Sequence, residues 1–205
     1  MDATVLSLTG FAVAMYITPG PNNTMLASSG ANHGLRATVP HMLGIAAGFA
    51  LMLVLVDAGL GATLLATPGL LPFMRWGGAV WILYLAWKIA TAPPPGTAGQ
   101  ARVLGFVGAM AFQWINPKGW LIALAVASEF TRADRQLGQQ LMQIGLVFGA
   151  VAIPCMLPWV LLGTGVRTLL RSHTRLRLFN FAMALLLVVS LIPVLTGDQA
   201  TEAAP

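Results

Sequence analysis

Charged residues are scarce in this chain. Asp, Glu, Lys and Arg make up 8% of its 205 residues, whereas roughly 25% is typical of a soluble domain. Hydrophobic residues make up 57%, and the mean hydropathy is +0.79. This balance excludes an ordinary water-soluble fold and predicts an integral membrane protein with no separate soluble domain.

Cysteine and the usual catalytic motifs are also lacking. The single Cys155 excludes an intrachain disulfide and a membrane thiol–disulfide carrier, which needs two cysteines. No HExxH or GxSxG motif and no pair of acidic residues within one apolar segment occurs, so we do not expect an enzyme or a cofactor. His33 and His41 lie eight residues apart without cysteine or carboxylate partners, so no metal site is expected.

Six apolar segments follow one another along the chain, each of the length needed to cross a bilayer, about 20 residues. They are Val5–Ala31, Pro40–Ala66, Leu71–Thr91, Val103–Glu129, Leu137–Leu162 and Leu178–Leu195. We therefore predict an all-α membrane protein with a single transmembrane domain over residues 1–205. The first segment follows Asp2 and no basic residue, so we expect it to remain in the mature protein.

Lys and Arg residues favour one side of these segments. The first, third and fifth connections hold seven of the eleven: Arg36, Lys88, Arg102, Arg167, Arg171, Arg175 and Arg177. The other side has three: Arg75, Arg132 and Arg135. Because short cytoplasmic loops carry an excess of basic residues, we predict that the odd-numbered connections are cytoplasmic and that both termini are periplasmic.

Proline motifs interrupt two of the six segments. Val5–Thr18 has 14 residues and Val103–Ile115 has 13, so each would form a helix of about 20 Å, shorter than a hydrocarbon core of roughly 30 Å. Each helix is therefore predicted to break inside the membrane, at ITPG (17–20) and at INPK (115–118). Non-helical backbone at that depth is tolerated only within protein or beside a water-filled cavity. One break alone would favour a simple kink, but two matched breaks favour a transport site.

The two breaks belong to a repeat. They lie 98 positions apart, and the next segment in each half carries two glycines four residues apart: Gly44 and Gly48, and Gly145 and Gly149. Small residues at this spacing let helices approach closely in lipid. Because three segments per repeat would invert the second copy, we predict two inverted three-helix repeats, about 1–91 and 103–196, whose broken helices meet near the membrane midplane.

These motifs resemble those of a known protein family. TPGPNN (18–23) and NPK (116–118), in a six-segment chain of this length, resemble the LysE/RhtB family of amino-acid exporters over essentially the whole chain. The longer stretches TPGPNNTMLASSGANHGLR and WILYLAWKIATAP are most similar to its cysteine/O-acetylserine exporter branch. The resemblance implies a bacterial inner-membrane protein that exports small amino acids or derivatives, of the cysteine/O-acetylserine, homoserine or threonine type, by the proton-motive force.

The predicted exporter function also indicates the partners. They are a small amino-acid substrate, protons and the lipid bilayer, with no nucleic acid, and a homodimer is left open. An exporter or channel for a metal ion or another small solute is the alternative function, although the segments hold few carboxylates to replace a hydration shell. Substrate-specific flux driven by a proton gradient would distinguish the two.

The substrate is expected to bind between the two breaks. The candidate binding residues are Pro19, Gly20, Pro21, Asn22, Asn23 and Thr24 in the first break and Asn116, Pro117 and Lys118 in the second. The prolines free backbone carbonyl groups, and the start of a half helix offers N–H groups to a carboxylate. Lys118 is a rare charge close to membrane depth, suited to a substrate carboxylate or a proton relay.

Asp57 is the other charged residue deep in an apolar segment. It is the candidate for proton coupling, and it could also bind a substrate ammonium. Two further interpretations stay open: a pairing with Lys118 that holds the repeats together, and a place near the membrane interface, because its segment is long.

Overall fold

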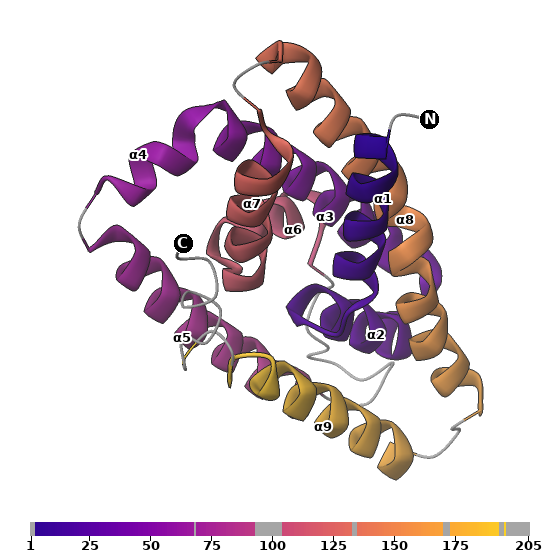
Figure 1. The fold of residues 1–205 in the computed structure, drawn as a ribbon. Helices are drawn as coiled ribbons and strands as arrows, with labels where there is room; N and C mark the ends of the chain where they lie inside the picture. The colour runs from indigo at the N-terminus through magenta and orange to yellow at the C-terminus, as the bar shows by residue number, and fades with distance from the viewer. Residues whose placement is uncertain are drawn as a thin grey trace.

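The computed structural model describes residues 3–67, 69–92, 104–132, 135–169, 173–192 and 195, and every regular element in these ranges is helical (Figure 1). The elements are α1 (Ala3–Ile17), α2 (Pro21–His33), α3 (Leu35–Leu55), a π-helical turn (Val56–Leu60), α4 (Gly61–Leu65), α5 (Leu70–Ala90), α6 (Phe106–Phe112), a 3-10 turn (Gln113–Ile115), α7 (Pro117–Phe130), α8 (Leu137–Leu169) and α9 (His173–Val189). The all-α prediction is confirmed for these residues.

Membrane-crossing length is met by two helical stretches of the described chain, Leu35–Leu65 and Leu137–Val166. The apolar stretches Thr4–Ile17 and Phe106–Ile115 are shorter, and they are the ones that end at the proline motifs. The six-segment topology therefore stays a prediction.

Both predicted helix breaks are present. α1 ends at Ile17 and α2 begins at Pro21, while the 3-10 turn ends at Ile115 and α7 begins at Pro117. Each new helix has proline in its first turn, where the missing N–H costs no intrahelical hydrogen bond. Figure 1 shows that α2 turns sharply away from the direction of α1.

Two boundaries differ from those predicted by hydropathy. α3 begins at Leu35 instead of Pro40, because Gly34 with φ of 85° ends α2 and the next helix starts at once. α8 continues to Leu169, seven residues past the predicted Leu162. Hydropathy marks the apolar part of a helix, whereas the backbone stays helical through its polar end. Arg102, Arg171, Asp2 and the linker 93–103 lie outside the described residues, as does the side chain of Arg167.

α2 lies at the centre of the molecule. It packs against α8, α3 and α9, and 11 of its 13 residues are buried, although many of them are polar. At its end Asn32 donates to Asn180 of α9 (2.9 Å), and Asn180 donates back to the Asn32 Oδ1 (3.1 Å). Buried amides need such partners, so α2 is fastened to α9 by a reciprocal amide pair.

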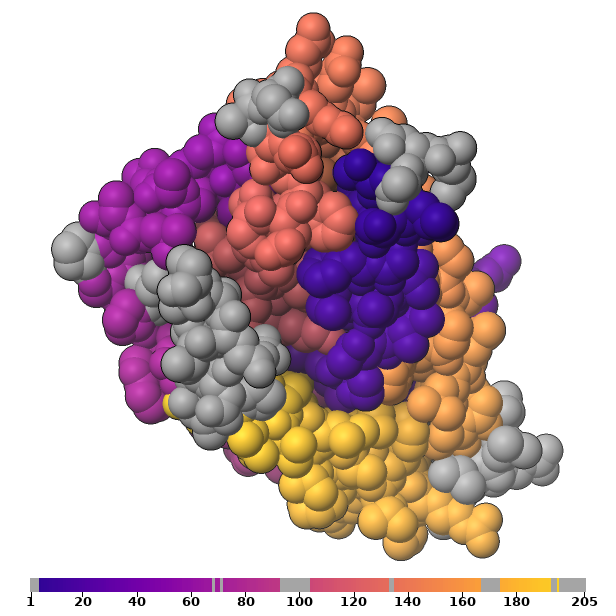
Figure 2. Space-filling view, viewed as in Figure 1, coloured from indigo at the N-terminus to yellow at the C-terminus, as the bar shows by residue number. Residues whose placement is uncertain are grey.

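The helices pack in exchanged pairs, meaning that the first helix of each half of the chain packs on a helix of the other half. α1 packs on α8 and α6 packs on α3, while α3 contacts α8 and α5 contacts α9. Figure 2 shows α1 beside α8 on one face, with the beginning of α8 extending beyond the rest of the fold.

The first predicted glycine pair makes a close helix contact. A Cβ on Gly48 would lie 2.6 Å from the Met110 Cα, and one on Gly44 would overlap the Phe106 carbonyl group. α3 therefore packs on α6 with little space between their backbones, as the spacing predicted.

The second glycine pair does not repeat this contact. A Cβ on Gly145 would lie 3.2 Å from the Val54 side chain, but nothing lies within 4 Å of one on Gly149. The close approach on α8 occurs instead at Gly163, where a Cβ would overlap the carbonyl oxygen of Ala27 in α2. The prediction of a close-packing pair in α8 is therefore wrong at Gly149, because the facing helix crosses α8 nearer its end.

Candidate functional site

The two helix breaks meet around a small cavity. Six of the nine predicted binding residues line it: Gly20, Pro21, Asn22, Asn23, Asn116 and Lys118. Pro19, Thr24 and Pro117 do not. The cavity volume is about 30 Å³, which is room for about two water molecules. In this arrangement the site is closed to anything as large as an amino acid.

Lys118 joins the second break to the first. Its Nζ donates to the carbonyl oxygen of Thr18 (2.9 Å) and to that of Pro19 (3.4 Å). These carbonyl groups stand just past the end of α1, where a cation is favoured by the helix dipole. A Cβ on Gly20 would lie 2.9 Å from the Lys118 Cδ, so glycine is needed for the lysine to pass this close.

Asn23 and Thr24 mainly stabilise the first break itself. The Asn23 amide nitrogen donates to the carbonyl oxygens of Tyr16 (2.6 Å) and Thr18 (2.9 Å). The Thr24 hydroxyl donates to those of Gly20 (2.9 Å) and Pro21 (3.0 Å). Because the break leaves the Tyr16 and Thr18 carbonyl groups without helical partners, the Asn23 side chain supplies their hydrogen bonds. The Thr24 hydroxyl adds a second donor to the Gly20 oxygen, which also accepts the Thr24 backbone N–H (3.0 Å).

Gln113 is a site residue that the sequence analysis missed. Asn22 donates to the Gln113 Oε1 (2.9 Å), and Gln113 donates to the Asn22 Oδ1 (3.3 Å) and to the carbonyl oxygen of Ala109 (2.8 Å). The Gln113 side chain is fully buried. The available signal was an uncharged amide inside an apolar segment, three residues before Asn116.

Two buried polar atoms at the cavity have no hydrogen-bond partner among the described residues, Asn116 Oδ1 and Tyr16 Oη. Asn116 is the N-cap of α7 but makes no side-chain cap hydrogen bond, although asparagine in that position commonly does. Both residues line the cavity and are at least 95% buried. Because buried polar groups are normally paired, these atoms are available to a ligand or to water.

Aromatic rings close one side of the cavity. Tyr16, Phe49 and Phe148 form a triangle with ring centroids 5.7 to 5.9 Å apart, and Tyr16 and Phe49 also line the cavity. The rings come from α1, α3 and α8, so three helices converge on this wall.

Asp57 lies far from this cavity. The Thr131 hydroxyl donates to its Oδ1 (2.8 Å), just after the last residue of α7. Lys118 is in the first turn of α7, so the length of the helix separates the two by about 20 Å. The pairing of Asp57 with Lys118 is therefore wrong, because Asp57 bonds Thr131 at the opposite end of α7, just after Phe130. The part of the chain that the structure describes holds no cluster of metal-ligating residues either.

Similarity to known proteins agrees with this architecture. Residues 13–191 match the family described as LysE type translocator, a range that includes both breaks. The chain belongs to the LysE type translocator family. It is therefore a membrane transporter, in keeping with its helical fold. No solved structure matches this translocator.

The translocator also has named relatives of similar length. It is 32% identical over 173 residues to the cysteine/O-acetylserine efflux protein of Escherichia coli O9:H4 (strain HS), which covers 84% of this chain and 87% of the relative. The protein of that name from Shigella flexneri serotype 5b (strain 8401) matches equally well. The one from Escherichia coli O139:H28 (strain E24377A / ETEC) is 31% identical over the same length.

Proposed function

We propose that this translocator exports cysteine, O-acetylserine or a similarly small amino acid across the bacterial inner membrane, driven by the proton-motive force. Family membership and the names of the relatives support amino-acid efflux. The observation that carries the proposal is the meeting of two broken helices at one cavity, with Lys118 reaching from one break to the other.

The substrate groups have natural partners in the cavity. A carboxylate is suited to the start of α2, whose first N–H groups lack helical acceptors, and to the Lys118 ammonium. The Asn22 amide lies at the same helix start. The rings of Tyr16 and Phe49 offer an apolar wall to a short side chain. The proposed ligand is therefore a small molecule with a carboxylate.

Transport requires the cavity to open, because its volume is about 30 Å³. The reciprocal amide pair of Asn22 and Gln113 crosses between the two breaks, so it parts when they separate. We propose alternating access in which the substrate enters between α2 and α7 from the cytoplasm and leaves on the other side, with Asp57 as the proton-coupling candidate.

The proposed topology is two inverted three-helix repeats with both termini periplasmic. Its support is the exchanged packing, in which α1 contacts α8 as α6 contacts α3. Hydrogen bonds also group the predicted connections in space. Asn32 and Asn180 adjoin the first and fifth connections, and Thr131, in the fourth connection, bonds Asp57 in the second half of the second segment.

The decisive experiment is flux in proteoliposomes. Labelled cysteine, O-acetylserine, homoserine, threonine and lysine are offered with and without an imposed proton gradient, and a divalent metal ion serves as the outgroup. Saturable flux of one or two amino acids that increases with the gradient is expected. Metal flux without amino-acid flux would favour the alternative exporter or channel.

Lys118→Ala is expected to abolish this flux while the protein still inserts, because the substituted side chain leaves the carboxylate without its cation. His33→Ala is the control and should change flux little, since His33 lies at the end of α2 and does not line the cavity. Normal flux in Lys118→Ala would contradict the assignment of the site.

A further inference from the structure

The Lys118 side chain marks a second subsite within the proposed substrate site. Resting on the proposed function, we propose that the carbonyl oxygens of Thr18 and Pro19 bind the α-ammonium group of the substrate at the edge of the cavity, and that Lys118 holds this place while the cavity is closed. The substrate would then exchange with Lys118 instead of simply joining it.

An ammonium group already lies at this position. The Lys118 Nζ is 2.9 Å from the Thr18 oxygen and 3.4 Å from the Pro19 oxygen. The ε-ammonium of lysine and the α-ammonium of an amino acid are both primary ammonium groups with three N–H donors. A pair of carbonyl groups that accepts one can accept the other at the same distances.

The break creates these acceptors. In an unbroken helix the Thr18 and Pro19 carbonyl oxygens would accept the N–H groups of Asn22 and Asn23, four residues later, but the extended backbone of Gly20 interrupts that pattern. Asn116 offers a further acceptor in the adjoining cavity, since its Oδ1 has no partner among the described residues.

The exchange conserves charge inside the site. When the substrate ammonium takes the carbonyl groups, Lys118 is released to pair with the substrate carboxylate. A zwitterion brings no net charge, so the site keeps the single positive charge of Lys118 before and after binding. An unpaired charge would be costly at membrane depth, and this exchange leaves no charge unpaired.

This exchange predicts which molecules bind. An amine without a carboxylate cannot displace Lys118, because the released lysine would have no anion to meet. An acid without an ammonium would draw Lys118 away and leave the Pro19 carbonyl oxygen without this donor, while Asn23 continues to donate to the Thr18 oxygen. The site should therefore require both groups on one molecule, and removing the lysine should open the carbonyl pair to simple amines.

The test uses three probes of one size under a reducing agent: cysteine, 2-aminoethanethiol, which lacks the carboxylate, and 3-mercaptopropionic acid, which lacks the ammonium. Binding is measured as the shift in thermal unfolding of the purified full-length protein, which rises with ligand concentration over Kd. Wild type, Lys118→Met and Lys118→Arg are compared. Methionine is similar in length without the ammonium, while arginine keeps a cation that can reach the carbonyl groups.

Wild type is expected to respond to cysteine alone. Lys118→Met should lose the response to cysteine and gain at least about a tenfold lower Kd for 2-aminoethanethiol, as a charge-assisted hydrogen-bonding site becomes vacant. Lys118→Arg should gain nothing for the amine. Equal binding of the amine by wild type and Lys118→Met would overturn the subsite. So would a wild type that binds cysteine normally together with a Lys118→Met variant that gains no affinity for 2-aminoethanethiol.

A second variant guards against misfolding of Lys118→Met. Gly20→Ala places a Cβ 2.9 Å from the present position of the Lys118 Cδ, so the flexible lysine must shift, and we expect its hold on the carbonyl groups to weaken. It should also gain affinity for the amine, and no gain in a folded Gly20→Ala protein would count against the subsite. If wild type transports no amino acid yet Lys118→Met binds 2-aminoethanethiol, the ammonium subsite stands and the proposed function fails.

Discussion

At the scale of single residues, the Asn22 and Gln113 amides determine how tightly the two breaks are held together. Each donates to the other, so replacing either one removes both hydrogen bonds and leaves the amide oxygen of its partner without this donor. Hydrogen bonds between membrane helices contribute about 0.6 kcal/mol on average and up to about 1.7 kcal/mol. Two reciprocal bonds belong near the upper end of that range.

We therefore expect energetic coupling between Asn22→Leu and Gln113→Leu. The losses in the free energy of unfolding of the two single variants should add up to more than the loss in the double variant. The difference, which is the coupling energy, should be about 1–2 kcal/mol. Reversible unfolding of the two single variants and the double variant measures it. Additive effects would show that the amide pair contributes nothing to the closed arrangement.

The breaks themselves were predictable from single residues, because proline at 19, 21 and 117 removes helix hydrogen bonds wherever the chain lies. Lys118 was predictable too, as a charge next to a break. Gln113 was not, since an uncharged amide in an apolar segment does not reveal which helix it faces. Asp57 shows the same limit: its depth along the chain indicated a buried acid, and only the packing of α7 places it beside Thr131.

At the scale of helices, the contact between α2 and α8 depends on glycine. Gly163 faces the backbone of Ala27, and a Cβ on Gly30 would lie 2.5 Å from the carbonyl oxygen of Val160. Backbone atoms cannot move aside as a flexible side chain can. A side chain at either glycine must therefore push the two helices apart.

Gly163→Ala is expected to lower the free energy of unfolding by about 1–3 kcal/mol, the usual cost of overpacking. Gly149→Ala is the matched control on the same helix, because its Cβ would meet nothing within 4 Å, and it should be neutral or slightly stabilising. Thermal unfolding in detergent compares them. Equal loss of stability in both variants would contradict the close contact at Gly163.

The spacing of small residues identified the α3 contact and misidentified the α8 contact. Gly145 and Gly149 have the same spacing as Gly44 and Gly48, yet spacing does not say where a neighbouring helix crosses. The crossing point on α8 is set by α2, whose path follows from the break at Gly20. Helix ends were missed for a similar reason, since Gly34 ends α2 through a positive φ that hydropathy does not record.

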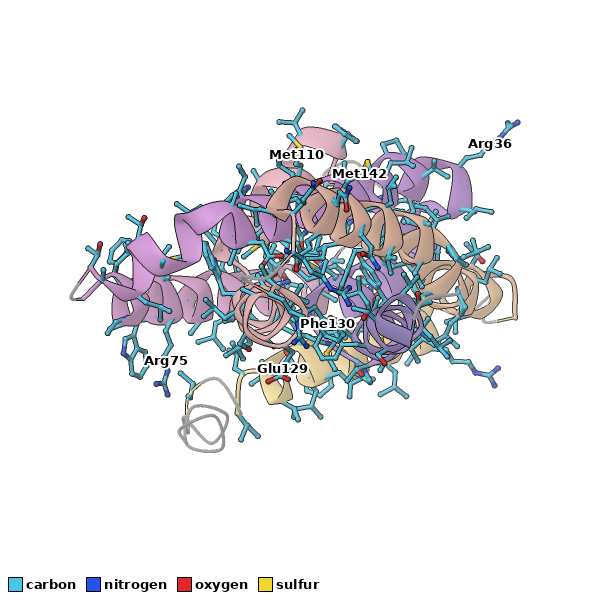
Figure 3. The ribbon with its side chains drawn as sticks, turned by 45° about the horizontal axis from the view of Figure 1, so that its top comes forward. Arg36, Arg75, Met110, Glu129, Phe130 and Met142 are labelled. Carbon is cyan, nitrogen blue, oxygen red and sulfur yellow. The ribbon has the colours of Figure 1, made fainter. Side chains whose placement is uncertain are left out.

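At the scale of the whole molecule, the proposed topology places Arg36 and Arg75 on opposite sides of the membrane. Figure 3 shows the two side chains projecting away from the fold at different ends of the view. Arg36 follows Leu35 at the start of α3, and Arg75 lies in the second turn of α5 and donates to the Leu195 carbonyl group.

Single cysteines at these positions test the topology. In a Cys155→Ser background, Arg75→Cys is expected to react with a membrane-impermeant maleimide in intact cells, and Arg36→Cys only after the cytoplasmic side is exposed. Cys155 is the one cysteine of the sequence, so the background variant has no thiol and should not label from either side. Labelling of both positions from one side would overturn the predicted orientation.

The fastening of α2 by amides has an electrical consequence. No Asp, Glu, Lys or Arg occurs in α2, and the residues that hold its two ends, Asn22 and Asn32, bear no charge. Moving one elementary charge across a membrane voltage of 100 mV changes its energy by about 2.3 kcal/mol. Moving a helix without formal charge involves no such energy. If α2 moves and carries a zwitterion, exchange of labelled for unlabelled cysteine should proceed at the same rate when a potassium diffusion potential is imposed. A rate that depends on the voltage would mean that a charged element, such as α7 with Lys118, moves during transport instead.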